Sequence, residues 1–364
     1  MRERPIALFE SWRGRYADSP RAISERLGER HPEIRQIWVA NEGTSLPAGV
    51  DRVVRHTPTY FARLATCDLL VANDIVSKHL VKGPRVHYLQ TWHGTPLKVI
   101  GHDEQMPAYD NAKVLARQDR DVRKWDALLS SGPECTAMFR SAFQFDGQVL
   151  EVGYPRNDVL RSAEAPAIRE RVRRDLGLED SATAVLYAPT WRDDVQRPDG
   201  TFGDPGGLDV DAFTTATGED TVVLMRMHSV VSTRRGRDAS GRVLDVSDHP
   251  EIAELYLAAD VLVSDYSSAI YDFAVTGKPV VLFAYDLEHY RDGIRGMYLD
   301  YEDWAPGPIV TTVDELADTV TAVTLPGGMD PWKGRYEQFV QRFCPDEDGG
   351  ATDRVIDRFI EPLL

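Results

Sequence analysis

Short runs of apolar residues recur along the whole chain, separated by polar or helically spaced stretches. The runs are rich in Val, Ile and Leu and do not alternate with polar residues, which is typical of strands buried on both faces of a parallel sheet. They predict two sets of six strands, the first at Ile6–Phe9, Ile37–Ala40, Leu69–Ala72, Val86–Leu89, Leu128–Ser130 and Val149–Val152, and the second at Ala184–Ala188, Val222–Met225, Leu244–Val246, Val261–Ser264, Val280–Phe283 and Ile309–Thr311. Strands that alternate with helices in this way indicate an α/β fold with doubly wound parallel sheets.

Helix signals occupy the stretches between these runs. Ser19 and Pro20 are a typical N-cap and first-turn pair, and Ile23 follows them at helical spacing. Asp248 is placed to cap another helix further along the chain. The last residues, Thr352–Leu364, have the pattern of a short amphipathic helix. The connections between strands are therefore expected to be mainly helical.

The length of 364 residues suggests two domains, since domains commonly have about 150 residues. The polar stretch 161–178 separates the two sets of strands. We therefore expect a first Rossmann-like domain at 1–160, a second at 161–345, and a terminal loop and helix at 346–364. Residues 193–211 are rich in Asp, Gly and Pro, which predicts a long loop. Two such domains are expected to hold a ligand in a cleft at the carboxyl ends of their strands.

Composition narrows the class of protein. Hydrophobic residues make up 42% and charged residues 27% of the chain, as in ordinary soluble enzymes. The net charge of −16 disfavours nucleic acid as a partner. Cys67, Cys135 and Cys344 lie far apart, which is typical neither of a disulfide framework nor of a zinc site and fits a reducing cytosol. Neither a secretory signal nor a membrane-spanning run of ~20 apolar residues is expected.

The charge is divided unevenly along the chain. Residues 1–175 carry a net charge of +4, and residues 176–364 carry a net charge of −20. A basic stripe at helical spacing lies in the first half, at Lys113, Arg117, Arg120 and Lys124. Apolar contacts beside it are expected from Val114, Leu115, Val122 and Trp125. Such a face predicts peripheral contact with an anionic membrane surface or a polyanionic acceptor, and a solvated helix face is the alternative.

The first candidate for chemistry is the segment QTWHGTPLK at 90–98, which directly follows a predicted strand. Gly94 and Pro96 break regular structure and would hold His93 on a tight turn, where an imidazole can take up a proton near neutral pH. Lys98 adds a cation that could meet a phosphate. A structural histidine is the alternative, but α/β active sites collect at this end of the strands.

Two further candidates lie at strand ends in the second half. Ser267 and Ser268 follow a buried strand and open a helix, whose free N–H groups and dipole attract phosphate. A plain serine N-cap would explain them as well. Arg226 and His228 alternate at the end of another strand and could together neutralise a diphosphate leaving group. A surface arginine and a hydrogen-bonded histidine are the alternative there.

Together these motifs resemble the CDP-glycerol glycerophosphotransferase family, which includes the teichoic acid glycerol-phosphate primases and polymerases of bacterial cell walls. The matching segments are ESWRGRYADSPRAI at 10–23, TWHGTPLK at 91–98, GYPRND at 153–158, PTWR at 189–192, RMH at 226–228, SDYSSAIYDF at 264–273 and GKPVVLFAYDLEHY at 277–290. The resemblance covers about residues 5–320. It implies the GT-B fold, in which two Rossmann-like domains face each other across a cleft.

The resemblance also implies an activity and residue roles. Family members transfer glycerol phosphate from CDP-glycerol to an acceptor hydroxyl and release CMP. His93 matches the histidine proposed as base on the acceptor hydroxyl, and His228 matches the histidine near the donor phosphates. Ser267 and Ser268 match the phosphate-binding serines. Further candidates for donor binding are Asp265, Arg226, Arg192, Asp272, Arg156 and Lys98.

The implied setting is the cytoplasmic face of the cell membrane, with a lipid-linked or polymeric glycerol-phosphate acceptor. No cofactor and no protein-bound metal are expected, and Mg²⁺ could accompany the donor diphosphate. One alternative is a GT-B transferase that uses CDP-ribitol or a sugar nucleotide. Another is a nucleotide-sensing scaffold without catalysis, which predicts that one of the motifs is damaged. The acceptor, the product length and the choice between primase and polymerase do not follow from the sequence.

Overall fold

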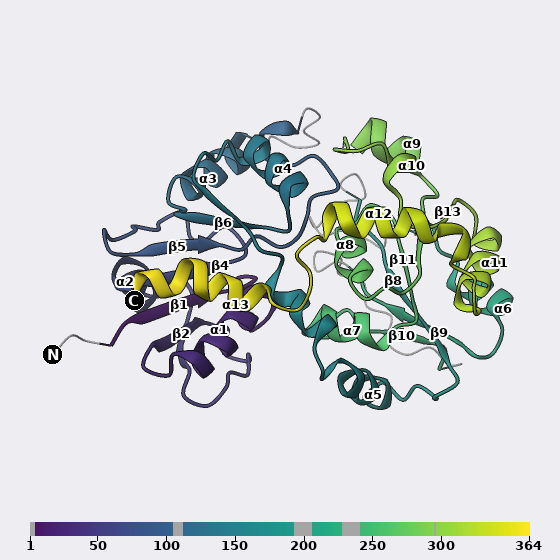
Figure 1. The fold of residues 1–364 in the computed structure, drawn as a ribbon, viewed down its shortest axis with the longest axis horizontal. Helices are drawn as coiled ribbons and strands as arrows, with labels where there is room; N and C mark the ends of the chain where they lie inside the picture. Colours follow the sequence, from purple (N-terminus) through teal and green to yellow (C-terminus); the bar gives the residue numbers. More distant parts are fainter. Residues whose placement is uncertain (1–3, 105–111, 193–205, 228–240, 295) are drawn as a thin grey trace.

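The computed structural model describes residues 4–104, 112–192, 206–227, 241–294 and 296–364. Figure 1 shows two α/β halves side by side, each built on one sheet with helices packed around it. The first sheet has the strand order β3-β2-β1-β4-β5-β6-β7, and the second has the order β10-β9-β8-β11-β12-β13. Every strand pair in both sheets is parallel. The prediction of doubly wound parallel sheets is therefore confirmed.

The strands lie close to the predicted apolar runs. The first sheet contains β1 (Ile6–Glu10), β2 (Arg35–Val39), β3 (Asp51–Val53), β4 (Leu69–Ala72), β5 (His87–Gln90), β6 (Ala127–Ser130) and β7 (Gln148–Glu151). The second contains β8 (Thr183–Ala188), β9 (Thr221–Met225), β10 (Val243–Asp245), β11 (Val261–Ser264), β12 (Val280–Phe283) and β13 (Ile309–Val310). Of the described strands, the apolar pattern misses only β3. Asp51 and Arg52 on this edge strand are exposed, so an apolar run cannot reveal it.

Helices connect the strands in both halves. The α-helices are α1 (Asp18–Arg30), α2 (Pro58–Thr66), α3 (Ala112–Val122), α4 (Pro133–Phe143), α5 (Ala165–Asp175), α6 (Val210–Thr217), α7 (Ile252–Ala258), α8 (Ala269–Ala274), α9 (Leu287–His289), α10 (Tyr301–Trp304), α11 (Val313–Thr324), α12 (Lys333–Phe343) and α13 (Ala351–Val355). Short 3₁₀ and π turns are η1 (Gly101–Asp103), η2 (Pro155–Arg161), η3 (Tyr290–Ile294), η4 (Asp330–Trp332), η5 (Ile356–Ile360) and η6 (Glu361–Leu363). The last three helical segments of the chain, from α13 through η6, confirm the predicted terminal helix.

Three local predictions need correction. Helix α1 begins at Asp18 and not at Ser19, and the Asp18 carboxylate accepts a hydrogen bond from the Ser19 backbone N–H (2.6 Å). Helix α7 follows Glu251, so Asp248 does not cap it. Helix α6 starts at Val210, inside the range predicted as a loop, and residues 193–205 of that range lie outside the described residues. Local hydrogen bonds mark two of these starts, since Asp18 accepts from the Ser19 N–H in α1 and Asp209 accepts from the Ala212 N–H (3.0 Å) in α6.

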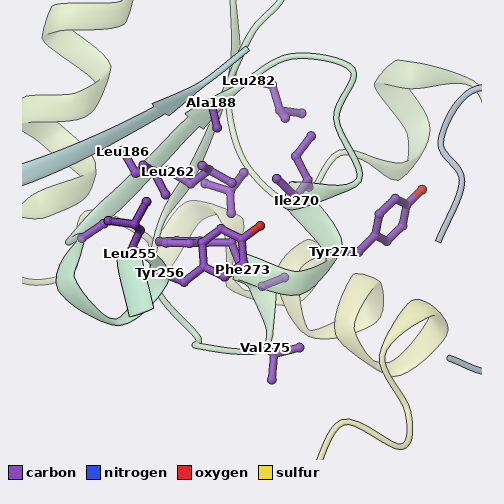
Figure 2. Packing of buried hydrophobic residues seen from close by; sticks show 14 of the residues in the cluster. Leu186, Ala188, Leu255, Tyr256, Leu262, Ile270, Tyr271, Phe273, Val275 and Leu282 are labelled. Atoms are coloured by element: carbon purple, nitrogen blue, oxygen red, sulfur yellow. The ribbon is translucent and has the colours of Figure 1, made fainter. Parts of the chain in front are cut away.

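Apolar side chains from helices cover both faces of each sheet. On one face of the second sheet, Leu186, Leu262 and Leu282 point toward α7 and α8 (Figure 2). Tyr256 and Phe273 pack against them, and all five side chains are fully buried. Burying a side chain of this size contributes roughly 1.5–3 kcal/mol. This layer therefore fixes the end of β11 against the start of α8, where two of the predicted site residues lie.

The end of the chain returns to the first half. Figure 1 shows α12 beside the second sheet and α13 across the first. Val355, Ile356 and Phe359 join the apolar cluster that contains Phe9 and Ile23 of the first half. The terminal helix therefore packs as part of the first half, while the exact boundaries expected near 160 and 345 stay predictions. No helix in the described ranges has the length and apolar character that a bilayer span requires.

Glu347 lies in the segment that crosses between the halves and is 7% exposed. Its Oε1 accepts a hydrogen bond from the backbone N–H of Tyr154 (2.9 Å). Burial, together with the nearby carboxylate of Asp272, raises the pKa of Glu347 from 4.5 to about 8. The folded protein therefore holds a proton on Glu347 in a pH range where the unfolded chain releases it.

We expect Glu347→Gln to stabilise the protein at alkaline pH. Because the folded-state pKa is raised, the contribution of Glu347 is full below pH 4.5 and is lost as pH rises toward about 8. Glutamine keeps an acceptor for Tyr154 and cannot ionise. At pH 8.5 the variant should gain on the order of 1–4 kcal/mol in urea unfolding, and the gain should vanish near pH 5. Exposed Glu170→Gln is the control, and a gain independent of pH would contradict this ionisation.

Candidate active site

A cavity of about 530 Å³ lies between the two halves, at the carboxyl ends of their strands. The first half contributes residues that follow β1, β4, β5 and β7, and the second half contributes residues that follow β8, β9, β10 and β11. The predicted site residues that line the cavity are His93, Arg156, Arg226, Ser267, Ser268 and Asp272. Lys98, Arg192 and Asp265 are not part of this lining, and His228 lies outside the described residues.

His93 follows β5 and is held from several sides. Its Nδ1 lies 2.8 Å from the carbonyl oxygen of Asn73, which can only accept, so Nδ1 carries the proton and Nε2 keeps its lone pair. The indole rings of Trp92 and Trp12 lie near the imidazole, with centroids 4.3 and 4.9 Å away. Burial lowers the pKa of His93 from 6.5, against a smaller opposing effect of the Asn73 carbonyl. The imidazole is therefore neutral at pH 7 and can accept a proton at Nε2.

The turn that carries His93 approaches the second half closely. Gly94 has a φ of +126°, and a Cβ atom there would lie 2.8 Å from Nη2 of Arg156 and 3.3 Å from Oγ of Ser268. Only glycine combines this backbone conformation with this approach. Ser267 and Ser268 precede α8 as predicted, and the Ser267 hydroxyl oxygen accepts a hydrogen bond from the Ala269 N–H (3.2 Å). The imidazole and the serine pair therefore belong to one cavity.

Arg156 joins the two halves and is not a free cation. Its Nη2 donates to both carboxylate oxygens of Asp272 (3.0 and 2.8 Å), and its Nη1 lies 3.4 Å from both carboxylate oxygens of Asp18. Asn157 donates a further hydrogen bond to Asp272 (3.0 Å). The side chains of Arg156 and Asp272 are only 8% and 6% exposed. These residues form a charge-compensated wall of the cavity, and their expected role in donor binding stays a prediction.

Arg226 is the second-half cation in the cavity lining. Its Nη1 donates hydrogen bonds to the carbonyl oxygens of Val246 (2.8 Å) and His249. Within the described part of the chain, no carboxylate lies at ion-pair distance from this guanidinium. Burial lowers the pKa of Arg226, but an arginine stays charged at neutral pH. Arg226 can therefore offer its charge to an anion in the cavity.

Arg192 and Asp265 form a buried network outside the cavity lining. Arg192 pairs through Nε and Nη2 with Asp286 (2.8 and 2.9 Å), and Nη2 also lies 2.9 Å from Asp265. The Arg192 side chain is 2% exposed. Lys98 forms an isolated backbone bridge with Met297 of the second half. Arg192, Asp265 and Lys98 therefore do not line this cavity, and their expected role in donor binding stays a prediction.

Sequence reasoning missed several polar residues of the cavity. They are Trp12, Arg13, Arg15 and Asp18 from the turn between β1 and α1, Asp74 after β4, and Glu251 before α7. Burial raises the pKa of Glu251 to about 7, although Arg21 lies 3.3 Å away. The available signal in the sequence for these missed cavity residues was their position after a predicted strand. In the described ranges, no group of three or more His, Cys, Asp or Glu side chains is placed to hold a metal ion.

Comparisons with known proteins agree with this arrangement. The family described as CDP-Glycerol:Poly(glycerophosphate) glycerophosphotransferase matches residues 1–361. A teichoic acid glycerol-phosphate transferase of Staphylococcus aureus is 36% identical over 368 residues, which are 96% of this chain and 91% of that protein. A teichoic acid poly(glycerol phosphate) polymerase of Bacillus subtilis is 33% identical over 362 residues. That match covers 97% of this chain but 48% of the polymerase, so the chain spans about half the length of this relative.

A solved structure is also similar over the whole fold. The wall teichoic acid polymerase TagF, as a variant soaked with CDPG, matches with a TM-score of 0.89 and 32% sequence identity. The match covers 100% of this chain and 90% of that one. The expected GT-B-like pair of facing α/β halves is therefore confirmed. With the family pattern matched from end to end of the described fold, the chain belongs to the CDP-glycerol:poly(glycerophosphate) glycerophosphotransferase family.

Proposed function

We propose that this protein transfers glycerol phosphate from CDP-glycerol to a hydroxyl of a lipid-linked or polymeric glycerol-phosphate acceptor and releases CMP. The observation that carries the proposal is the single cavity that contains His93 of the first half and Ser267, Ser268 and Arg226 of the second. The family match and the TagF structure soaked with CDPG support the choice of donor. The reaction belongs to the synthesis of teichoic acid or a related cell-surface polymer.

In this proposal the acceptor hydroxyl oxygen attacks the phosphorus atom that bears glycerol. The bond from that phosphorus to the bridging oxygen of the diphosphate breaks, and CMP leaves with its electron pair. The hydroxyl proton passes to Nε2 of His93, because Asn73 holds the proton on Nδ1. The hydroxyls of Ser267 and Ser268 and the charge of Arg226 stabilise the negative charge that grows on CMP.

The remaining candidates have separate roles in this proposal. His228 is assigned to the donor phosphates on the strength of the family resemblance and its place two residues after Arg226. Arg192 and Asp265 affect the donor through the strand ends that they hold. Arg156 and Asp272 set the position of one half against the other. No protein-bound cofactor is assigned, and any Mg²⁺ would be carried by the donor diphosphate.

Replacing His93 with glutamine should lower kcat by about 10²-fold or more, because it removes a general base. The affinity for CDP-glycerol should stay within a few-fold. Since the pKa of His93 is lowered, wild-type activity should fall only below pH 6.5, as the imidazole becomes protonated. His87→Gln, at the other end of β5, is the matched control. Stopped assays of CMP release across pH provide the measurement, and a variant within a few-fold of wild type would remove His93 from catalysis.

The identity of the donor separates this proposal from the other transferase assignments. Wild-type protein should transfer glycerol phosphate from CDP-glycerol to a glycerol-phosphate acceptor, and mass spectrometry should detect the increase in acceptor mass. Transfer from CDP-ribitol or UDP-glucose should be much slower. A preference for either of those donors would replace glycerol phosphate with ribitol phosphate or a sugar as the transferred group. Binding of CDP-glycerol without CMP release would favour the scaffold alternative.

Peripheral membrane contact on the cytoplasmic face is a separate part of the proposal. On α3, Lys113 and Arg120 are exposed, and Val114 is 57% exposed. Val81 is 72% exposed, and its neighbour Lys82 donates a hydrogen bond to the carbonyl of Lys124 after α3 (2.9 Å). These features support a small basic and apolar face. Two of the expected apolar contacts are corrected, since the side chains of Val122 and Trp125 are buried in the core.

Wild-type protein should cosediment with anionic vesicles but not with neutral ones. Each basic group near such a surface contributes about 1 kcal/mol, and salt screens this attraction. The double variant Lys113→Glu and Arg120→Glu should bind several-fold less, whereas Arg174→Glu, at an exposed site of the second half, should bind like wild type. Binding that ignores lipid charge, or an equal loss in both variants, would count against this face.

A further inference from the structure

The turn between β1 and α1 has a strained backbone that its surroundings hold in place. Trp12, Arg13 and Gly14 have consecutive positive φ values of 45°, 59° and 122°. The carbonyl oxygen of Ser11 accepts hydrogen bonds from the N–H groups of Gly14 (2.9 Å) and Arg15 (2.8 Å). Non-glycine residues in such conformations are strained and cluster at functional sites. The turn presents Trp12, Arg13 and Arg15 to the cavity.

The charges of this turn are only partly compensated. Nε of Arg13 donates to Asp74 (3.0 Å), and the Trp12 indole N–H donates to Asp18 (3.1 Å), which also faces Arg156. Arg15 is exposed, and among the described residues no carboxylate lies at ion-pair distance from it. Asp18 and Asp74 therefore already have partners, and the Arg15 guanidinium can bind an anion from solution.

We infer that the turn formed by Trp12, Arg13 and Arg15 is a subsite for a phosphodiester group of the acceptor. This inference rests on the proposed glycerophosphate transfer. The acceptor hydroxyl must reach Nε2 of His93, and the Trp12 ring, which is 38% exposed, lies with its centroid 4.9 Å from that of the imidazole. In a glycerol-phosphate chain, one glycerol unit separates the terminal hydroxyl from the next phosphodiester. The turn is placed to bind that phosphodiester while the hydroxyl contacts His93.

The assignment to the acceptor follows from the division of the cavity. The groups assigned to the donor diphosphate, Ser267, Ser268 and Arg226, all belong to the second half. Arg13 and Arg15 belong to the same half as the proposed base, and the charge of Arg15 also reaches Arg226, whose pKa, already lowered by burial, it helps to lower. A phosphodiester held there favours acceptors that already carry glycerol phosphate over neutral hydroxyl acceptors. The turn is therefore a specificity-determining element for chain extension.

The test measures binding of glycerophosphoglycerol, the smallest phosphodiester of this type, in the presence of saturating CDP. Isothermal titration calorimetry should show that Arg15→Gln lowers the affinity for glycerophosphoglycerol by about tenfold or more. Arg15→Lys, which keeps the charge, should lower it less. The affinity for CDP should be unchanged in both variants. Arg35→Gln is the matched control, because Arg35 is an exposed arginine of β2 outside the cavity. Melting temperatures verify that each variant is folded.

Three results would overturn the subsite. They are the absence of glycerophosphoglycerol binding to wild type, equal binding to wild type and Arg15→Gln, and a loss of CDP affinity in Arg15→Gln, which would move Arg15 to the donor. Failure of the proposed function is distinguishable from these, because the binding assay needs no turnover. Arg15-dependent binding in a protein that does not release CMP from CDP-glycerol would support the subsite and reject the proposed transfer.

Discussion

The ion pair between Arg156 and Asp272 is the interaction on which the geometry of the cavity depends. Burial disfavours the charged guanidinium, yet Asp272 and Asp18 outweigh it and raise the pKa of Arg156. A buried pair of this kind adds little net stability over apolar packing, but removing one partner leaves an uncompensated charge. Its effect here is positional, because Nη2 of Arg156 lies only 2.8 Å from the position that a Cβ of Gly94 would take, next to Ser268. The pair therefore sets how closely the His93 turn approaches the serines of the second half.

The same short segment that supplies Arg156 also fastens the end of the chain. The backbone N–H of Tyr154 binds Glu347, and the carboxylate of Asp158 accepts hydrogen bonds from the N–H groups of Ala351 (2.9 Å) and Thr352 (2.7 Å) at the start of α13. Gly153 allows this contact, since a Cβ atom there would lie 2.7 Å from the carbonyl oxygen of Asp346. The segment that contains Tyr154, Arg156 and Asp158 thus supports both the end of the chain and the ion pair with Asp272. A change in either contact is therefore transmitted to the cavity wall.

The sequence predicts those parts of the structure that depend on local pattern. Continuous apolar runs locate the strands because both faces of each sheet are covered, and they miss β3 because Asp51 and Arg52 face solvent. Position after a strand correctly brings His93 and Ser268 to one cavity. The same rule fails for Arg192, because adjacency to a strand end does not tell which way a side chain turns. That choice is made by Asp286 and Asp265, which are distant in the sequence.

The net charge of a long stretch of the chain does not predict which charge this cavity binds, because most of those charges lie far from the cavity. Residues 176–364 carry a net charge of −20, yet this stretch supplies Arg226 and two serine hydroxyls to the cavity. Exposed charges more than about 8–10 Å apart are screened at physiological salt, whereas groups in contact inside a partly buried cavity are not. Hydrogen bonds to a charged partner act only at contact, where they are also strongest. The preference of the cavity for an anion is therefore set by a few side chains at strand ends, and the surrounding acidic surface does not reverse it.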